Sequence, residues 1–329
     1  MSYHNLCGYG SPSLIVAWLS FIALTLLWGF SFIAIRVTLE LFPPFAAAAI
    51  RIFLAGLILM SVAFLKKRRI LLSRKNIFQL MGIGMIYFGI AWACLFWGEQ
   101  FVMPAVASII NSTLPIMVFV LSFKLLKNEK PMPMEFIGVG LGFVGILFVF
   151  VPSIQAFSLD QSVFYGMLAV MGMVVAYGFG TVLTRKMGAQ ISVYWGFVFQ
   201  AMPAALFLFT LSFMFEPQSW MSLDAIRNHP RALWGIAYLA VFSTAIAWVL
   251  YFKLLHTWGA LRASSVTYAM PVVSVFADWI FLKRLPTLYQ LIGAGLILQA
   301  IYIMRWAQYR KMSAMPKLAE VKVKVASSS

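Results

Sequence analysis

Residues 87–121 read YFGIAWACLFWGEQFVMPAVASIINSTLPIMVFVL, and residues 243–277 read STAIAWVLYFKLLHTWGALRASSVTYAMPVVSVFA. Sliding the chain by 156 residues superposes these two stretches without a gap and gives seven identities. They include Trp92 with Trp248, Ser108 with Ser264, and Pro115 with Pro271. Apolar identities arise easily in an apolar chain, whereas tryptophan and proline matches do not. The repeat indicates that the chain consists of two similar halves.

The composition around this repeat is that of a polytopic helical membrane protein. Of the 329 residues, 63% are hydrophobic and 10% are charged, with a mean hydropathy of +0.92. A soluble domain is about 45–50% apolar and about 25% charged. A water-soluble fold of this length could not bury so much apolar surface, so the composition excludes soluble enzymes and nucleic-acid-binding modules.

Ten apolar runs are long enough to cross a bilayer, which takes about 20 residues per helix. They lie near residues 15–35, 44–64, 77–97, 101–123, 134–152, 162–184, 193–215, 232–252, 261–282 and 287–306. The runs are continuous rather than alternating, which disfavours a membrane β-barrel. The predicted fold class is an all-α membrane protein with ten transmembrane helices.

The basic residues predict the orientation of these helices. With the N-terminus inside, 19 of the 25 Lys and Arg residues fall in cytoplasmic segments and five fall outside, while Arg51 lies within a span. Because Lys and Arg of short loops are retained in the cytoplasm, both termini should be cytoplasmic in a multi-pass protein of the cell membrane. The net charge of +16 then reflects loops that meet anionic lipid, rather than a nucleic-acid partner.

Ten helices in two halves imply five per half, so the second half enters the membrane from the opposite side. The expected organisation is a cytoplasmic N-terminus at 1–14, a first five-helix repeat at 15–152, a second at 162–306 and a basic cytoplasmic tail at 307–329. Two inverted copies of one unit can exchange conformations, which suits alternating access. Transport is therefore the expected function.

Several short motifs resemble the drug/metabolite transporter superfamily of the EamA type. In the first half they are Leu27 to Phe32, Ala49 to Phe53, and Gly98 to Val102 leading to Pro115; in the second they are Ala263 to Pro271 and Gln290 to Gly295. The resemblance covers residues 16–306 and implies two inverted five-helix repeats. It also implies export of small metabolites, often amino acids, through a central cavity lined by spans 1, 3, 4, 6, 8 and 9. The chain departs from the family at Arg284, because the family usually has an acidic residue before the last span. In the first half, that acidic residue is present as Glu129.

Two polar stripes beside prolines are the candidate substrate-binding groups. They comprise Ser108, Asn111, Ser112 and Pro115 in one half, and Ser264, Thr267, Tyr268 and Pro271 in the other. A proline inside a helix frees the carbonyl four residues earlier, here that of Asn111 and that of Thr267. The stripes either face a shared aqueous cavity or merely bond their own kinked backbones.

Aromatic and ionisable residues within or near the spans are further candidates. Trp28, Trp92, Tyr177 and Trp248 could stack on an apolar or cationic substrate, or could simply pack. Arg51 is an ionisable residue within a span and so a functional candidate, and the favoured interpretation is a structural anchor within snorkelling reach, paired with Glu40. Glu99 is a possible coupling or gating residue at an outer mouth, and capping of a helix start explains it equally well.

No catalytic signature is present, and the three histidines at 4, 229 and 256 are scattered. No cofactor or metal is expected, and the expected partners are a small-molecule substrate and membrane lipids, in a monomer or homodimer. The alternatives to a transporter are a membrane-embedded enzyme, a channel and a receptor. Glycines at 138, 142, 145, 293 and 295 predict close packing of the fifth and tenth helices.

The orientation can be tested with a C-terminal reporter that is active only outside the cytoplasm. The cation bias predicts that a fusion after Ser329 stays silent, whereas a fusion in the loop after residue 152 is active. Activity of the C-terminal fusion would contradict both the orientation and the even number of spans.

Overall fold

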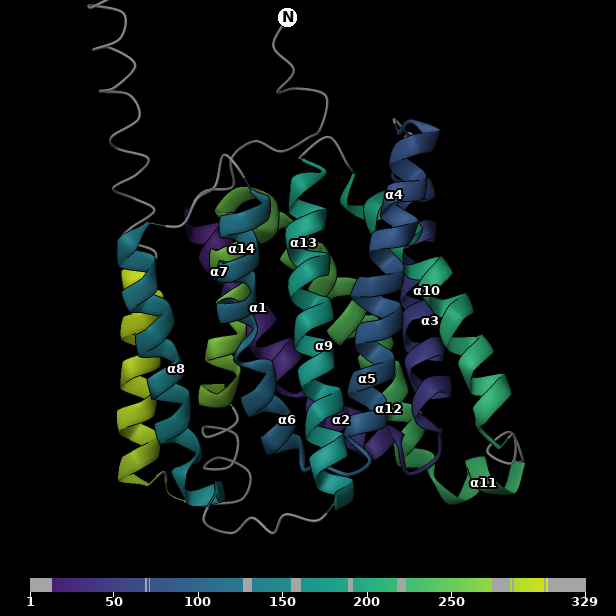
Figure 1. The fold of residues 1–329 in the computed structure, drawn as a ribbon. Coiled ribbons are helices and arrows are strands. Elements are labelled where there is room, and N and C mark those ends of the chain that lie inside the picture. The colour runs from purple at the N-terminus through teal and green to yellow at the C-terminus, as the bar shows by residue number, and fades with distance from the viewer. Residues whose placement is uncertain are drawn as a thin grey trace, which may run out of the picture.

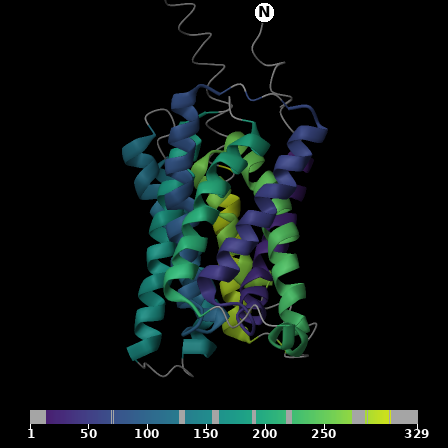
Figure 2. The ribbon, with the colours of Figure 1, turned by 90° about the vertical axis from the view of Figure 1, so that its right-hand side faces the viewer.

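The computed structural model describes residues 14–68, 70, 72–126, 132–154, 161–188, 192–217, 223–273, 285, 287–304 and 306. These residues form a bundle whose long helices share one general direction (Figures 1 and 2). In the first half the helices are α1 (Leu14–Gly29), α2 (Ser31–Thr38), α3 (Pro44–Leu65), α4 (Arg74–Gly84), α5 (Ala91–Gly98), α6 (Pro104–Asn111), α7 (Leu114–Leu125) and α8 (Pro133–Ile154).

The second half continues with helices of the same kind. They are α9 (Gln161–Lys186), α10 (Val193–Phe215), α11 (Leu223–Asn228), α12 (Pro230–Ala240), α13 (Ala247–Trp258) and α14 (Ala260–Ser264), followed by helical residues 266–273 and the helix Leu288–Met304. Within the described residues the chain is helical between its turns, as expected where water cannot satisfy backbone groups.

Seven of the described helices are long and apolar enough to cross a membrane by length and composition. They are Ile15–Thr38, Pro44–Leu65, Arg74–Gly98, Val106–Leu125, Gln161–Lys186, Val193–Phe215 and Pro230–Trp258. Pro133–Val149 and Leu288–Met304 are shorter apolar helices at the predicted fifth and tenth positions. The predicted ninth span, 261–282, runs beyond residue 273 and out of the described residues.

Two of the long helices contain a π-helical turn in their middle. The turn η2 (Met85–Ile90) joins α4 to α5, and the turn η4 (Val241–Ile246) joins α12 to α13. The shift of 156 residues that aligns the tryptophans also superposes these two turns. In Figure 1, α4 lies above α5 while α13 lies above α12, so the two helices run in opposite directions.

The sequence predicted a helix around Pro115 that continues through the proline, and the structure corrects this. The chain turns at Ser112 and Thr113, and α7 starts afresh with Pro115 in its first turn. A proline there sacrifices no intrahelical hydrogen bond, because the first N–H groups of a helix have no partner within it. Pro271, in contrast, lies within helical residues 266–273.

Glycines let α8 and the helix Leu288–Met304 approach each other, and the two lie together at one edge of the bundle (Figure 1). A Cβ on Gly145 would lie 2.9 Å from the carbonyl oxygen of Gly293, and one on Gly293 would lie 2.5 Å from that of Gly145. The predicted packing of these helices is thus confirmed for both residues. Gly142 differs, because it faces the ring of Tyr268, and Gly295 faces open space.

Gly145→Leu should therefore separate the two helices and lower the melting temperature in detergent, at a cost of about 1–3 kcal/mol for overpacking. The matched control is Gly140→Leu on the same helix, since a Cβ at Gly140 meets nothing within 4 Å. Equal melting temperatures for the two variants would contradict the close contact.

Candidate functional site

A cavity with about 510 Å³ of space between atoms, including its open mouth, lies among the helices of both halves. The residues that line it are Trp28, Ser31, Phe32, Arg51, Tyr87, Leu95, Asn111, Leu114, Met173, Tyr177, Trp248, Tyr251, Thr267 and Met270. They come from spans 1, 3, 4, 6, 8 and 9, the set implied by the family resemblance, together with span 2 through Arg51.

Residues related by the internal repeat lie on this cavity as pairs. The shift of 156 residues relates three lining residues of the first half to three of the second, namely Leu95 to Tyr251, Asn111 to Thr267 and Leu114 to Met270. Both members of each pair line the cavity. The two halves therefore build it with corresponding segments.

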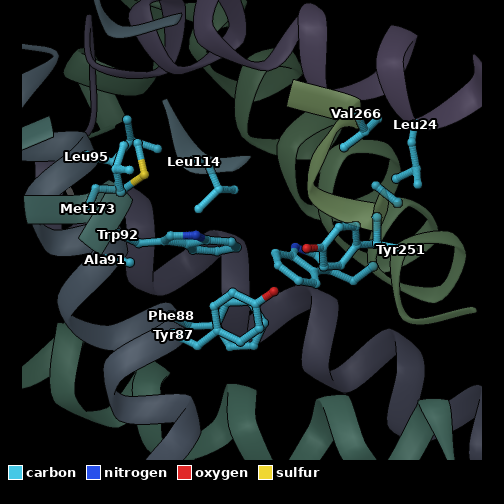
Figure 3. Packing of buried hydrophobic residues seen from close by; sticks show 14 of the residues in the cluster. Leu24, Tyr87, Phe88, Ala91, Trp92, Leu95, Leu114, Met173, Tyr251 and Val266 are labelled. Atoms are coloured by element: carbon cyan, nitrogen blue, oxygen red, sulfur yellow. The ribbon is translucent and has the colours of Figure 1, made fainter. Parts of the chain in front are cut away.

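Trp248 is the centre of a cluster of aromatic rings beside the cavity. Its ring centroid lies 4.7 Å from that of Phe88, 5.1 Å from that of Tyr87 and 5.2 Å from that of Tyr251. Figure 3 shows Trp92 and Tyr251 on opposite sides of this cluster, with Tyr87 and Phe88 below them in the view. Rings at these separations stabilise one another beyond the area they bury.

Hydrogen bonds fix several of these rings from across the bundle. The indole N–H of Trp92 donates to the hydroxyl of Tyr177, and that of Trp28 donates to the carbonyl oxygen of Ser243 at 3.0 Å. Thr181 links the hydroxyls of Tyr87 and Tyr251, at 2.9 Å and 3.3 Å. The polar ends of these rings are thus oriented, and four of the residues line the cavity, namely Trp28, Tyr87, Tyr177 and Tyr251.

Arg51 differs from its predicted role. Only 4% of it is exposed, so it does not snorkel, and its hydrogen bonds are made with the second half rather than with Glu40. Its Nε donates to the hydroxyl of Thr244 at 2.7 Å and its Nη2 to that of Ser243 at 3.0 Å. The guanidinium also lies 4.2 Å from the centroid of Trp92, which is a cation–π distance.

The predicted polar stripes separate into residues that line the cavity and residues that do not. Asn111 and Thr267 line it, and the amide of Asn111 has only a 3.6 Å contact with the sulfur of Met270. Ser108, Ser112 and Ser264 are buried elsewhere. Ser112 donates to the carbonyl oxygens of Ser108 at 2.8 Å and Thr267 at 3.1 Å, so it takes up the carbonyl that Pro271 frees.

Besides Ser108 and Ser112, four predicted positions of the polar stripes lie off the cavity. Ser264 donates to the carbonyl oxygen of Leu261 at 2.7 Å, within its own helix. Tyr268 is directed at α8, where its hydroxyl donates to the carbonyl oxygen of Val139 at 3.1 Å. Pro115 and Pro271 shape the backbone without lining the cavity. The contacts of these residues fit the second interpretation of the polar stripes, in which the side chains bond or shape the backbone.

Glu99 follows the last residue of α5 and is fully buried. It lies at a helix end rather than a helix start, so the capping explanation is wrong. Neither carboxylate oxygen has a hydrogen-bond partner, while its backbone carbonyl accepts from Nη1 of Arg36 at 3.0 Å. Burial raises the pKa of Glu99 well above its usual range, against the opposing effect of Arg51 and Arg36.

Sequence reasoning missed Arg51, Tyr87 and Tyr251 as lining residues. An ionisable residue inside a span is a functional signal, but the interpretation of Arg51 as an anchor placed it at the membrane surface instead. Tyr251 follows Trp248 by three residues and shares its helix face. Tyr87 lies within the π-helical turn η2, where regular α-helical spacing no longer predicts which side of the helix a residue occupies.

Among the described residues, no group of three His, Cys, Asp or Glu side chains could hold a metal ion. The chemistry that the described cavity offers is that of neutral hydrogen-bonding groups, aromatic faces and one guanidinium. These groups can bind and orient a solute.

The model of the EamA-like transporter family matches residues 15–151 and 164–306. The "Uncharacterized transporter YoaV" of Bacillus subtilis (strain 168) is 28% identical over 291 residues, covering 87% of this chain and 95% of the relative. YvbV of the same organism, also named an uncharacterized transporter, is 30% identical over 285 residues, covering 84% and 88%. The "Uncharacterized inner membrane transporter YedA" of Escherichia coli (strain K12) is 24% identical, covering 77% and 78%.

A solved crystal structure shares the fold with a TM-score of 0.70 at 18% identity, covering 89% of this chain and 98% of that one. The family match extends over most of both halves, and the helices form a bundle with segments of transmembrane length. The chain therefore belongs to the EamA-like transporter family and is a multi-pass membrane transporter.

Proposed function

We propose that the protein exports small metabolites, in particular amino acids or related amphipathic compounds, across the cell membrane by alternating access. The observation that carries the proposal is the cavity built from repeat-related pairs, with residues such as Asn111 and Thr267 contributed by opposite halves. A site shared between two exchangeable halves can be opened by either half.

The proposed architecture is ten transmembrane helices in two inverted five-helix repeats, with both termini in the cytoplasm. The superposable π-helical turns and their opposite directions in Figure 1 support the inversion. The two halves at 15–152 and 162–306 would then be the units that exchange conformation. The cation bias of the loops supports the orientation.

Two arginine contacts, one within each half, lie at opposite ends of the bundle. Nη1 of Arg36 donates to the carbonyl oxygen of Glu99 at the end of α5, and Nη1 of Arg185 donates to that of His256 near the end of α13, at 2.8 Å. These helix ends lie toward opposite ends of the bundle in Figure 1. Cations at helix ends are favoured by the helix dipole, and we propose that these contacts form and break as the gates.

The proposed substrate-binding residues are Trp28, Asn111, Tyr177, Trp248 and Thr267, which line the cavity, with Trp92 orienting Tyr177. Ser108, Ser112, Pro115, Ser264, Tyr268 and Pro271 would hold the backbone around them. We also propose membrane lipids as partners of the protein. The proposed assembly is a monomer or a homodimer. The rival functions are a membrane-embedded enzyme, a channel and a receptor.

Counterflow in liposomes tests the proposal. Vesicles containing the purified chain are loaded with one unlabelled amino acid and placed in a trace of the same labelled compound, for a panel of amino acids. A carrier gives a transient accumulation of label above equilibrium and saturates with concentration. Simple equilibration without overshoot would indicate a channel, and chemical change of the label would indicate an enzyme.

Asn111→Ala should raise the apparent substrate constant about two- to tenfold, because it removes one neutral hydrogen bond worth about 0.5–1.5 kcal/mol. Folded yield should be nearly unchanged. Ser265→Ala is the matched control, since Ser265 is buried nearby and donates within its own helix to the carbonyl oxygen of Arg262. An unchanged constant for Asn111→Ala would place the binding site elsewhere.

Glu99 gives a prediction about pH, because a coupling carboxyl must take up and release a proton. Its folded pKa lies above the value of about 4.3 expected when unfolded, so the folded state binds the extra proton. Stability should therefore fall as the pH rises from that value through the folded pKa.

Glu99→Gln should remove this loss, so its melting temperature in detergent should vary less between acidic and neutral pH than that of the wild type. Glu40→Gln is the control, because Glu40 is exposed at the same end of the helices. If the wild type and Glu99→Gln have parallel pH profiles, then Glu99 does not titrate in this range and cannot couple transport to protons.

A further inference from the structure

Arg51 is the only charged side chain among the described residues that line the cavity. It is 4% exposed, and its hydrogen-bond partners are the neutral hydroxyls of Ser243 and Thr244. The ion pair within the described residues joins Arg262 to Glu135 and does not involve Arg51. The guanidinium is therefore buried beside a cavity without a carboxylate in direct contact.

A buried charge is costly unless it is paired. The hydroxyls and the face of Trp92 offset part of this cost. Neither carboxylate oxygen of the buried Glu99 makes a hydrogen bond to Arg51. A guanidinium has five N–H donors, and the hydrogen bonds to Ser243 and Thr244 engage only Nε and Nη2. The other N–H groups of the Arg51 guanidinium can therefore donate to a ligand.

A second residue that lines the cavity has a donor without an acceptor. The indole Nε1 of Trp248 is buried and has no hydrogen-bond partner, although Trp248 lines the cavity and is only 1% exposed. Leaving a buried donor unsatisfied costs free energy that a bound acceptor would restore. The lining of the cavity thus includes one cation with N–H groups to spare and one indole N–H without a partner, and both can donate to an oxygen acceptor.

We propose that Arg51 and Trp248 form a carboxylate subsite, and that the transported solutes are monocarboxylates with an apolar or aromatic body. The planar guanidinium matches a carboxylate in shape and charge. A single cation balances a single negative charge but not a phosphate dianion. The walls formed by Trp28, Tyr251 and Met173 accept an apolar body. This subsite rests on the proposed transport function and specifies its substrate.

The test uses pairs of probes that differ only in the carboxylate. Purified full-length chain in detergent is titrated with L-phenylalanine, phenylacetate and 4-methylpentanoate, and with the primary amide of each, while binding is followed by thermal shift. Wild type should bind each acid at least about tenfold more tightly than its amide, the ratio expected for one charge-assisted hydrogen-bonded pair.

Arg51→Gln should bring the ratio of acid to amide affinity close to one, whereas Arg51→Lys should keep part of it. Trp248→Phe retains an aromatic ring and should weaken acids about two- to tenfold with little effect on the ratio set by Arg51. Arg74→Gln, at an exposed position at the start of α4, is the control and should leave the ratio as in the wild type.

Equal affinity for acids and amides in the wild type would overturn the subsite, as would a ratio that survives in Arg51→Gln. A purely structural Arg51 would lower the melting temperature and weaken acids and amides alike, which also overturns it. Counterflow separates failure of the carboxylate subsite from failure of the proposed transport function. If liposomes exchange the neutral amides without preference for acids, the transport function is supported and the carboxylate subsite is contradicted. If the liposomes exchange no solute, both proposals are contradicted.

Discussion

The lipid interior provides no water to hydrogen-bond a peptide group, and this constraint shapes both the bundle and its centre. Where the chain departs from a regular α-helix, a side chain supplies the missing partner. The hydroxyl of Thr244 donates to the carbonyl oxygen of Leu239, five residues earlier, inside the π-helical turn η4. The hydroxyl of Ser112 reaches the carbonyl oxygen of Thr267, which Pro271 leaves without its helical donor. Irregular backbone is thus kept where the two halves meet.

These irregular segments also bring the chemistry together. The π-helical turn η4 presents Ser243 and Thr244 to Arg51, so the guanidinium of the first half is bound by the second. The corresponding turn η2 brings Tyr87 to the ring cluster around Trp248. A π-helical turn inside an α-helix often marks a functional site, because the inserted residue rotates the side chains that follow it. Here two such turns flank one cavity.

The halves share a framework but differ in the polar residue at its centre. Arg51 lies seven residues after the start of α3, and Gln200 lies seven residues after the start of α10. Both are buried, yet only Arg51 carries a charge. Gln200 bonds within its own helix to the carbonyl oxygen of Gly196 at 3.1 Å. The two halves therefore share a framework, while the charge at its centre comes from one half alone.

The sequence alone determined the membrane class, the repeat and most helix positions, because apolar runs and matched tryptophans depend only on local composition and order. It also identified Trp28, Asn111, Tyr177, Trp248 and Thr267, which line the cavity. Only the tertiary structure decided which hydroxyls face the cavity and which bond the backbone, since Asn111 and Ser112 are neighbours in the chain with different surroundings. The same holds for Arg51, whose partners lie more than 190 residues away in the chain. The physical reason is that a side chain's role in lipid depends on which donor or acceptor another helix brings to it.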